Sequence, residues 1–247
     1  MSGHSKWSKV KHQKEATDAV KGKKYTKLTN SIAIAVRDGG GSTDPNSNIK
    51  LRLAISKARD FNLPKKIIER TIERAKGTGD QHLESKVYEA FGPGGIGIII
   101  ETATNNKQRT VAEIKNILDR GGGVLATTGA VSHLFQYVGL IHIKKDNKSF
   151  DEIMEGALEA GASDLEEVGS VVEIYTKPGD LHIIKEKLEE AGFIITSTEL
   201  FYKPQTTIPI SDAASASQIL KLLGSLEEGD DVVAVHANFD IPDEFIK

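Results

Sequence analysis

Residues 86–102 read KVYEAFGPGGIGIIIET. The first six residues alternate in polarity as a half-buried strand does, and GPGG at 92–95 is a turn signal. The residues from Ile96 to Thr102 are rich in β-branched side chains, which favour strands. This segment therefore predicts a β-hairpin. The spacing of apolar residues also changes here, because the apolar residues before this segment recur at helical spacing.

Two α/β series are predicted after the hairpin. A helix is expected over 109–120, followed by a strand over 131–135. Within 137–203 the pattern then predicts the βαββαβ order of a ferredoxin-like fold. Its elements are expected at 140–144, 150–160, near Leu165, and at 171–175, 180–190 and 193–201, with Ile153, Ala157 and Leu158 facing inward on the first helix.

The C-terminal residues repeat the α/β pattern, with a strand over 206–210, a helix over 212–226 and a strand over 232–237. Joined to residues 96–135, these elements complete a second βαββαβ arrangement, so residues 137–203 form an insertion. The predicted fold class is α+β: an N-terminal three-helix bundle with a basic arm, followed by two ferredoxin-like α/β domains, one inserted in the other. The expected domains are residues 1–79, residues 80–136 with 204–247, and residues 137–203.

Three short amphipathic helices are predicted upstream of the hairpin, within residues 23–77. Glycines 39–41 end the first helix, Pro64 suits the first turn of the third, and Gly77 closes it. The apolar residues at helical spacing are Tyr25, Leu28, Ile32 and Val36 in the first helix, Leu51, Ala54, Ile55 and Ala58 in the second, and Ile68, Ile72 and Ala75 in the third.

The net charge of −3 hides a strong asymmetry along the chain. Residues 1–79 hold 18 Lys and Arg against 7 Asp and Glu, whereas residues 80–247 hold 14 against 28. A solvated surface without a charged partner would mix both signs. The asymmetry therefore predicts that the N-terminal part meets a polyanion.

The first 27 residues form a lysine-rich arm without arginine. Lysine favours contact with phosphates over the bidentate base contacts of arginine, so we expect the arm to position a nucleic-acid backbone. Trp7 either stacks on an unpaired base or packs against the folded body. The alternative for the whole arm is a solubilising tail. The predicted contact residues of the arm are Lys6, Trp7, Lys9, Lys11, His12, Lys14, Lys21, Lys23, Lys24 and Lys27.

The sequence offers no familiar catalytic or cofactor motif. The absence of Cys excludes disulfides, thiolate metal sites and Cys nucleophiles. The seven His form no pair at i+3 or i+4, and HExxH is absent, so we expect no metal site, with His142 and His236 as half-buried sheet residues. The glycine clusters lack the P-loop and GxGxxG patterns. We therefore predict no catalytic residue and no cofactor.

The sequence resembles the YebC/PmpR family along nearly its whole length. Small departures are Leu63, where Met is common, and Asn105, where Asp is frequent. The residues that carry the resemblance include Gly3-His4-Ser5-Lys6-Trp7, Lys11-His12-Gln13-Lys14, Gly22-Lys23, Leu51-Arg52, Asn62-Leu63-Pro64, Ile68-Glu69-Arg70, Gly92-Pro93-Gly94-Gly95, Asn106 with Arg109-Thr110, and Ala237-Asn238-Phe239.

This resemblance implies three domains and a non-enzymatic cytoplasmic protein, usually described as a DNA-binding transcriptional regulator. It also implies kinship with a mitochondrial translational activator of cytochrome c oxidase and with family members linked to ribosomes stalled on proline-rich peptides. The chain shows neither a signal peptide nor an apolar run of about 20 residues, which agrees with a cytoplasmic, soluble protein that has no membrane partner. We further expect a monomer.

We predict a nucleic-acid-binding regulator of gene expression, with DNA as the first partner and transcription as the process. The alternative is a ribosome-associated translation factor that contacts ribosomal RNA. For DNA, the helix from Pro64 offers Lys65, Lys66, Arg70 and Arg74 as side chains for a major groove. For the ribosome, the lysine-rich arm suits contact with structured RNA, and an acidic body would limit non-specific binding. A third hypothesis is an enzyme or small-molecule sensor with its site between the two α/β domains, because ferredoxin-like folds host many functions.

Overall fold

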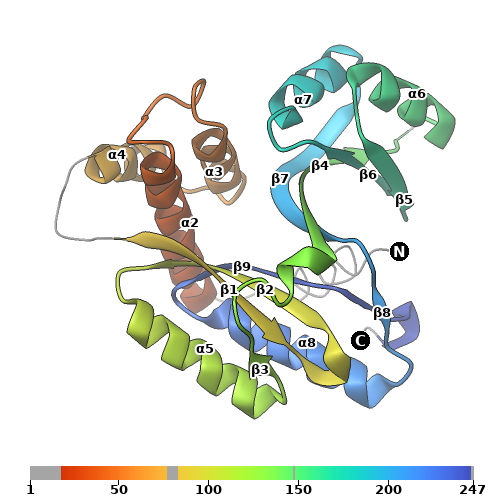
Figure 1. Cartoon of the computed structure of the whole chain (residues 1–247). Helices are drawn as coiled ribbons and strands as arrows, with labels where there is room; N and C mark the ends of the chain where they lie inside the picture. Colours follow the sequence, from red (N-terminus) through yellow and green to blue (C-terminus); the bar gives the residue numbers. More distant parts are fainter. Residues whose placement is uncertain (1–17, 77–82, 147, 246–247) are drawn as a thin grey trace. The chain divides into compact units, whose positions relative to one another are not determined.

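The computed structural model describes residues 18–76, 83–146 and 148–245 (Figure 1). The chain forms two compact units. One is Phe135–Gln205, the inserted unit, and the other consists of the described residues up to Leu134 and from Thr206 onward. The predicted boundary near residue 79 lies outside the described residues, so the division into three domains stays a prediction.

The three predicted helices form a bundle. They are α2 (Asp18–Asp38), α3 (Ile49–Asp60) and α4 (Lys65–Lys76). Their buried residues repeat the predicted spacing, since each helix turns its apolar stripe to the shared core. This core contains Leu28, Ile32, Val36, Leu51, Ile55, Ala58, Ile68 and Ala75.

Asn48 joins α2 to α3. Its Oδ1 accepts a hydrogen bond from the Leu51 N–H at 3.0 Å, which caps α3, and its Nδ2 donates to the Ala35 carbonyl at 2.7 Å. A Cβ at Gly39 would lie 2.2 Å from Nδ2 of Asn48. Glycine is thus needed at this position because the capping amide approaches the backbone closely.

The predicted hairpin is confirmed as β1 (Glu84–Phe91) and β2 (Gly97–Thr104), which pair antiparallel over their full length. They belong to a sheet with the order β3-β1-β2-β9, in which β3 is Val124–Leu125 and β9 is Val232–Ala237. The helices α5 (Lys107–Gly121) and α8 (Ala213–Glu228) pack on one face of this sheet. Its core includes Ile98, Ile100, Ile114, Leu118, Ile219, Leu222 and Val235.

Two predicted strands differ from the structure. The segment 206–210 does not join this sheet. Instead, β8 (Ile208–Pro209) pairs with β10 (Phe239–Asp240) in a separate ladder, and β1 occupies the place beside β2. The hairpin partner is nearer along the chain, and proline lacks the N–H that a central strand requires. Residues 132–134 form a 3₁₀ turn, so the strand predicted over 131–135 begins only at Phe135.

The inserted unit has the predicted βαββαβ order. It contains β4 (Phe135–Lys144), α6 (Phe150–Ala160), β5 (Asp164–Val168), β6 (Val171–Thr176), α7 (Leu181–Glu190) and β7 (Ile194–Pro204). The strand order β5-β6-β4-β7, with all neighbours antiparallel, is the ferredoxin-like arrangement. The predicted α+β fold class is therefore confirmed.

One residue of α6 was expected inside and lies outside. Ile153, Ala157 and Ala160 form the buried stripe of this helix, whereas Leu158 is 57% exposed. Leu158 follows Ala157 directly, and one residue turns the direction of a side chain by about 100° around a helix. The face of α6 that is buried is therefore the one that carries Ile153, Ala157 and Ala160, and Leu158 lies beside it.

Candidate nucleic-acid interface

Most of the predicted arm lies outside the described residues. This holds for Lys6, Trp7, Lys9, Lys11, His12 and Lys14, so the structure does not place them. Lys21 falls within α2, which begins at Asp18, but its side chain is not described. The remaining lysines of the arm, Lys23, Lys24 and Lys27, lie on α2, and the structure places their side chains.

These three lysines contact other parts of their own unit. The Lys23 Nζ lies 3.5 Å from Oδ1 of Asp230, and both side chains are largely exposed. Lys24 lies over the ring of Phe61, 3.6 Å from its centroid. The Nζ of Lys27 donates to the carbonyl oxygen of Glu227. An exposed ion pair such as Lys23–Asp230 contributes little free energy.

A row of exposed cations follows α4. Lys66, Arg70 and Arg74 recur every four residues, opposite the buried Ile68 and Ala75. At 1.5 Å per residue these three side chains extend over about 12 Å of helix. We call this row the basic stripe.

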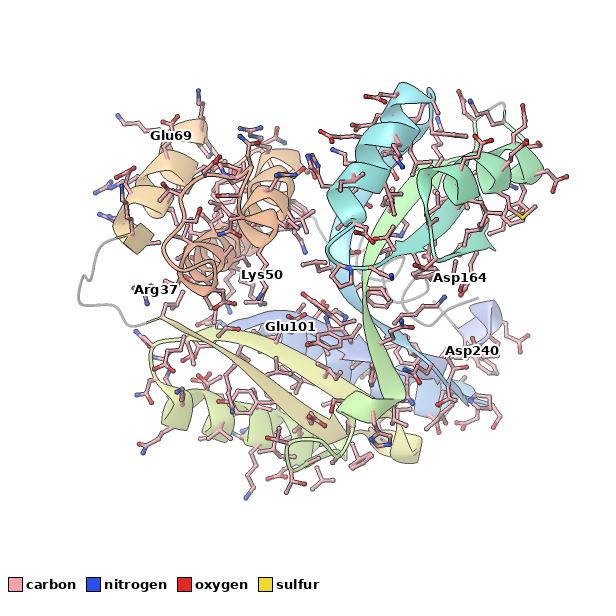
Figure 2. All side chains as sticks on the ribbon, turned by 45° about the horizontal axis from the view of Figure 1, so that its top comes forward. Arg37, Lys50, Glu69, Glu101, Asp164 and Asp240 are labelled. Carbon is pink, nitrogen blue, oxygen red and sulfur yellow. The ribbon has the colours of Figure 1, made fainter. Side chains whose placement is uncertain are left out.

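Acidic residues flank the basic stripe on one side. Lys65 lies 3.6 Å from Glu69 in an exposed pair, and Glu73 is also exposed (Figure 2 labels Glu69 on this helix). Because successive residues turn by about 100°, Glu69 and Glu73 lie next to the stripe and not within it. Of the four predicted residues of α4, Lys65 is thus paired within the helix, and the other three form the stripe.

The prediction missed two cations on α3. Lys57 and Arg59 are exposed in the last turn of this helix, just before the turn that leads to α4. The stretch 45–59 contains no acidic residue, and this was a signal that could have found them. Arg52 in the same stretch is structural, because its guanidinium donates to the carbonyls of Pro45 and Asn46 at 2.8 Å.

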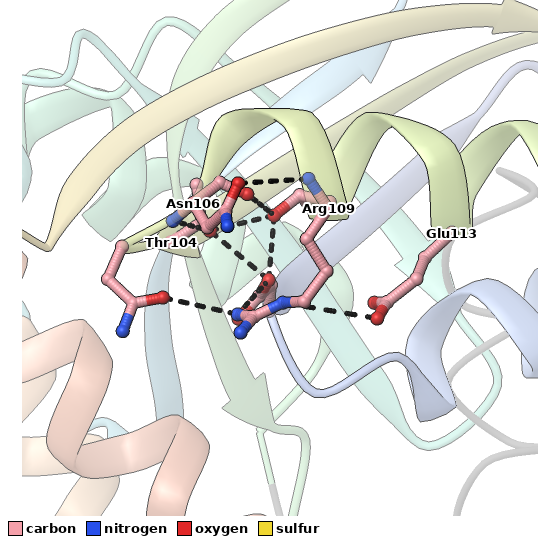
Figure 3. Close-up of polar contacts among 7 residues, drawn as sticks. Thr104, Asn106, Arg109 and Glu113 are labelled. Carbon is pink, nitrogen blue, oxygen red and sulfur yellow. Dashed lines mark hydrogen bonds and ion pairs between the residues drawn. The ribbon is translucent and has the colours of Figure 1, made fainter.

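A polar cluster at the end of β2 has a structural role (Figure 3). The carboxylate of Asp231 accepts hydrogen bonds from Thr110 at 2.6 Å, Arg109 at 2.9 Å and Thr104 at 3.2 Å. Burial acts to raise the pKa of Asp231, but these donors outweigh it and the pKa lies below its ordinary value. Asp231 is therefore a charged acceptor that ties the start of β9 to α5.

Asn105 belongs to the same cluster. Its Oδ1 accepts from the Arg109 guanidinium at 3.2 Å. An aspartate at this position would accept the same hydrogen bond with an added charge, so the departure at residue 105 keeps the contact.

The inserted unit brings a serine, a histidine and a glutamate together. His142 lies on β4 between Ser197 of β7 and Glu173 of β6, with 2.8 Å from Nδ1 to the serine Oγ and 3.4 Å from Nε2 to Oε1 of the glutamate. Tyr175 also donates to Glu173 at 2.6 Å. Ser197 lies within a strand, whereas the nucleophile of α/β hydrolases stands on a sharp turn. We interpret the set as a polar ladder across three strands.

In residues 18–76, 83–146 and 148–245, no helix is long and apolar enough to cross a bilayer. Within the same ranges, no group of three or more His, Asp or Glu is placed to hold a metal ion.

Comparison with known proteins shows similarity over the whole chain. Residues 5–78 match the TACO1/YebC protein N-terminal domain, and residues 83–239 match the TACO1/YebC second and third domain. Two relatives are each named a probable transcriptional regulatory protein. The one from Sulfurihydrogenibium is 44% identical over 100% of this chain and 98% of its own length, and the one from Acidithiobacillus ferrooxidans is 46% identical over 99% and 96%.

The crystal structure of a conserved hypothetical protein from Aquifex aeolicus has a similar fold. It superposes with a TM-score of 0.81 at 38% sequence identity, covering 91% of this chain and 92% of that one. The two family models together match most of the sequence, and the chain belongs to the TACO1/YebC family.

Proposed function

We propose that the protein is a non-enzymatic, monomeric regulator of gene expression that binds nucleic acid through its arm and helical bundle. The observation that carries the proposal is the basic stripe, because it presents three cations in a row on the outer side of a well-packed helix. The names of its relatives support transcription as the process. We propose DNA as the partner, because that is the polyanion on which a transcriptional regulator acts.

The stripe suits contact with a phosphate backbone. Duplex DNA carries one charge per about 1.7 Å of its axis, so a 12 Å row of cations faces several phosphates. Lys57 and Arg59 add to the positive charge of the bundle. Contacts of this kind position a protein on the duplex and carry little sequence information.

Binding of structured RNA by a translation factor is the second candidate. Glu69 and Glu73 beside the stripe favour it, because a helix inside a major groove has phosphates on both sides and would bring these carboxylates towards one of them. A helix that lies along one backbone avoids this repulsion. The two candidates thus differ in where α4 would lie on the nucleic acid: inside a major groove of DNA, or along one phosphate backbone of RNA.

The test is a salt titration of binding to duplex DNA and to structured ribosomal RNA. In such a titration, the logarithm of the binding constant falls linearly with the logarithm of the salt concentration, and each phosphate contact adds about 0.9 to the steepness on B-DNA. Replacing Lys66, Arg70 and Arg74 with Ala should therefore make this slope shallower by about 2 to 3 on the preferred partner. The matched control replaces the exposed Lys115, Arg120 and Lys221 with Ala, which removes the same charge from α5 and α8.

If both triple variants made the salt dependence shallower by the same amount, the effect would reflect net charge alone. This result would argue against direct phosphate contact by the basic stripe. Tighter binding to duplex DNA at matched salt would favour transcription, and tighter binding to ribosomal RNA would favour translation. Absence of measurable binding to either nucleic acid would refute the proposal.

A further inference from the structure

The basic stripe on α4 has two flanks of different chemistry. Glu69 and Glu73 lie on one side of it. Ile67 and Thr71 lie on the other side, because successive residues turn by about 100° and residues three and four apart are neighbours on a helix surface. A phosphate that approaches the stripe therefore meets carboxylates on the first flank and uncharged side chains on the second.

Ile67 is exposed although the residue after it is buried. Its side chain is 39% exposed, whereas Ile68 is 4% exposed and belongs to the core of the bundle. Among the described side chains of the bundle, Ile67 is the only large apolar one that is exposed. Packing inside the bundle thus leaves part of its apolar surface in contact with water.

The position of Ile67 places it among the cations. Single exposed apolar residues are common on soluble proteins, so exposure alone does not indicate a contact. Along the helix axis, however, Ile67 lies between Lys66, about 1.5 Å away, and Arg70, about 4.5 Å away. Arg74 follows two turns later on nearly the same side of the helix. The isoleucine and the cations therefore share one outer surface.

Thr71 completes this flank without adding a charge. Its Oγ1 donates to the carbonyl oxygen of Ile67 at 2.8 Å, one turn earlier, so the hydroxyl is engaged within α4. The carboxylates of α4 are those of Glu69 and Glu73, on the opposite flank. A strand of nucleic acid on the side of Ile67 and Thr71 thus avoids repulsion from this helix.

A nucleic-acid strand alternates charged and apolar groups. Its phosphates carry the charge, and the C–H surfaces of its sugars lie between successive phosphates. Proteins contact both the phosphates and the sugars of a backbone. Removal of apolar surface from water is favourable, so a sugar that packs on an exposed isoleucine adds to the attraction between cations and phosphates.

We propose that a nucleic-acid strand lies on the Ile67 flank of the basic stripe and that Ile67 packs against its sugars. The inference rests on the proposed function and adds the side from which the strand meets α4. The cations of the stripe contact the phosphates, and the two glutamates face away from the strand. Since every nucleotide carries a sugar, the contact of Ile67 adds affinity without sequence preference.

The first experiment compares Ile67→Ala with the unmodified full chain, on the nucleic acid that the unmodified chain prefers, over a range of salt concentrations. Binding should weaken by about threefold to tenfold, because the variant loses apolar carbons that are each worth about fourfold when fully buried. The slope of the salt dependence should stay the same, since no phosphate contact is lost. The loss should be equal on two unrelated sequences.

Val124→Ala is the matched control for this variant. Val124 is 58% exposed on β3, outside α4, so its replacement removes exposed apolar carbons away from the stripe. Binding by Val124→Ala should equal that of the unmodified chain.

Thr71→Lys tests the approach of the strand independently of Ile67. It adds a cation to the Ile67 flank, so binding should tighten and the salt dependence should become steeper by about 0.7 to 0.9, the contribution of one phosphate contact. Asn116→Lys adds the same charge to an exposed position of α5 and should leave this slope nearly unaltered.

The inference and the proposed function fail in different ways. If the unmodified chain binds neither DNA nor RNA, the proposed function is refuted. If the chain binds and depends on the basic stripe, but Ile67→Ala or Thr71→Lys behaves like its control, the inference alone is overturned. A loss at Ile67 that differs between sequences would indicate contact with a base and would also overturn the assignment to sugars.

Discussion

The two sheets have the same spatial arrangement of strands, but the chain supplies the strands differently. The sheet of the inserted unit takes its four strands from contiguous residues, Phe135–Pro204. In the other sheet, which we call the discontinuous sheet, β9 reaches its place beside β2 only after the insertion, and β1 replaces the strand expected from the C-terminal segment.

Buried polar side chains join the parts of the discontinuous sheet that short turns cannot join. Asp231 links the start of β9 to Thr104 and Thr110, which lie more than 100 positions earlier in the sequence. Glu89 and Asn238 hydrogen-bond to the backbone just before and just after the inserted residues. The comparison indicates that an interrupted fold needs directional contacts at the interruption, because the hydrophobic effect alone is non-directional.

Replacement of Asp231 should destabilise the discontinuous sheet more than any other substitution considered below. Asp231→Ala leaves the buried Thr104 and Thr110 hydroxyls and the Arg109 guanidinium without their shared acceptor, which should cost about 3 kcal/mol of unfolding free energy. Urea unfolding, monitored on residues of β2 and β9, measures this loss of unfolding free energy. The neighbouring Asp230→Ala removes an exposed carboxylate and should cost less than about 0.5 kcal/mol. Similar losses for both variants would contradict the special role of Asp231.

Acid should weaken the discontinuous sheet more than the inserted unit. The folded-state pKa values of Glu89 and Asp231 are lowered, so the stability they contribute is complete above the ordinary carboxyl pKa of about 4 and is lost as pH falls through the lower folded-state values. In the inserted unit, hydrogen bonding to Lys203 lowers the pKa of Asp164, but this carboxylate is largely exposed and counts for less.

Urea unfolding between pH 6 and pH 3, monitored separately on β9 and β6, checks this expectation. The β9 signals should lose stability first as the pH falls, and Glu89→Gln should flatten their pH dependence. The expectation fails if both sheets lose stability in parallel.

The smallest effect is expected at Leu158 of α6. Because this side chain is more than half exposed, Leu158→Ala should change the unfolding free energy by less than about 0.5 kcal/mol. Ile153→Ala on the buried stripe of the same helix should cost about 2–5 kcal/mol. Thermal or urea unfolding of the inserted unit distinguishes the two, and a large loss at Leu158 would show that this residue packs against something.

Local patterns predicted most elements because each depends on neighbours in the chain. The helix over 150–160 begins and ends as expected, since Ser149 and Glu152 form a capping box and Gly161 adopts a left-handed conformation at its end. The hairpin follows likewise from its alternation and its GPGG turn. The strand expected over 131–135 failed because the N–H groups of Val131 and Ser132 bond to a carboxylate more than 40 positions away.

The candidate interface was predictable in part. The charge asymmetry pointed to the N-terminal part, and the periodicity of α4 placed Lys66, Arg70 and Arg74 opposite its apolar face. The pairing of Lys65 with Glu69 is an i,i+4 contact within α4, which the helical spacing allows. The contact of Lys24 with Phe61 required coordinates, because it depends on how α2 packs against the end of α3.

Charge segregation, the helical bundle, the hairpin and the ferredoxin-like order of residues 135–204 follow from composition and periodicity, which act over a few residues at a time. Tertiary structure alone decided which strand lies beside β2, which stripe of α6 is buried, and that Glu89, Asn238 and Asp231 become anchors. These outcomes join residues that lie tens to more than a hundred positions apart, and contacts over such distances form only when the packed core brings the groups together.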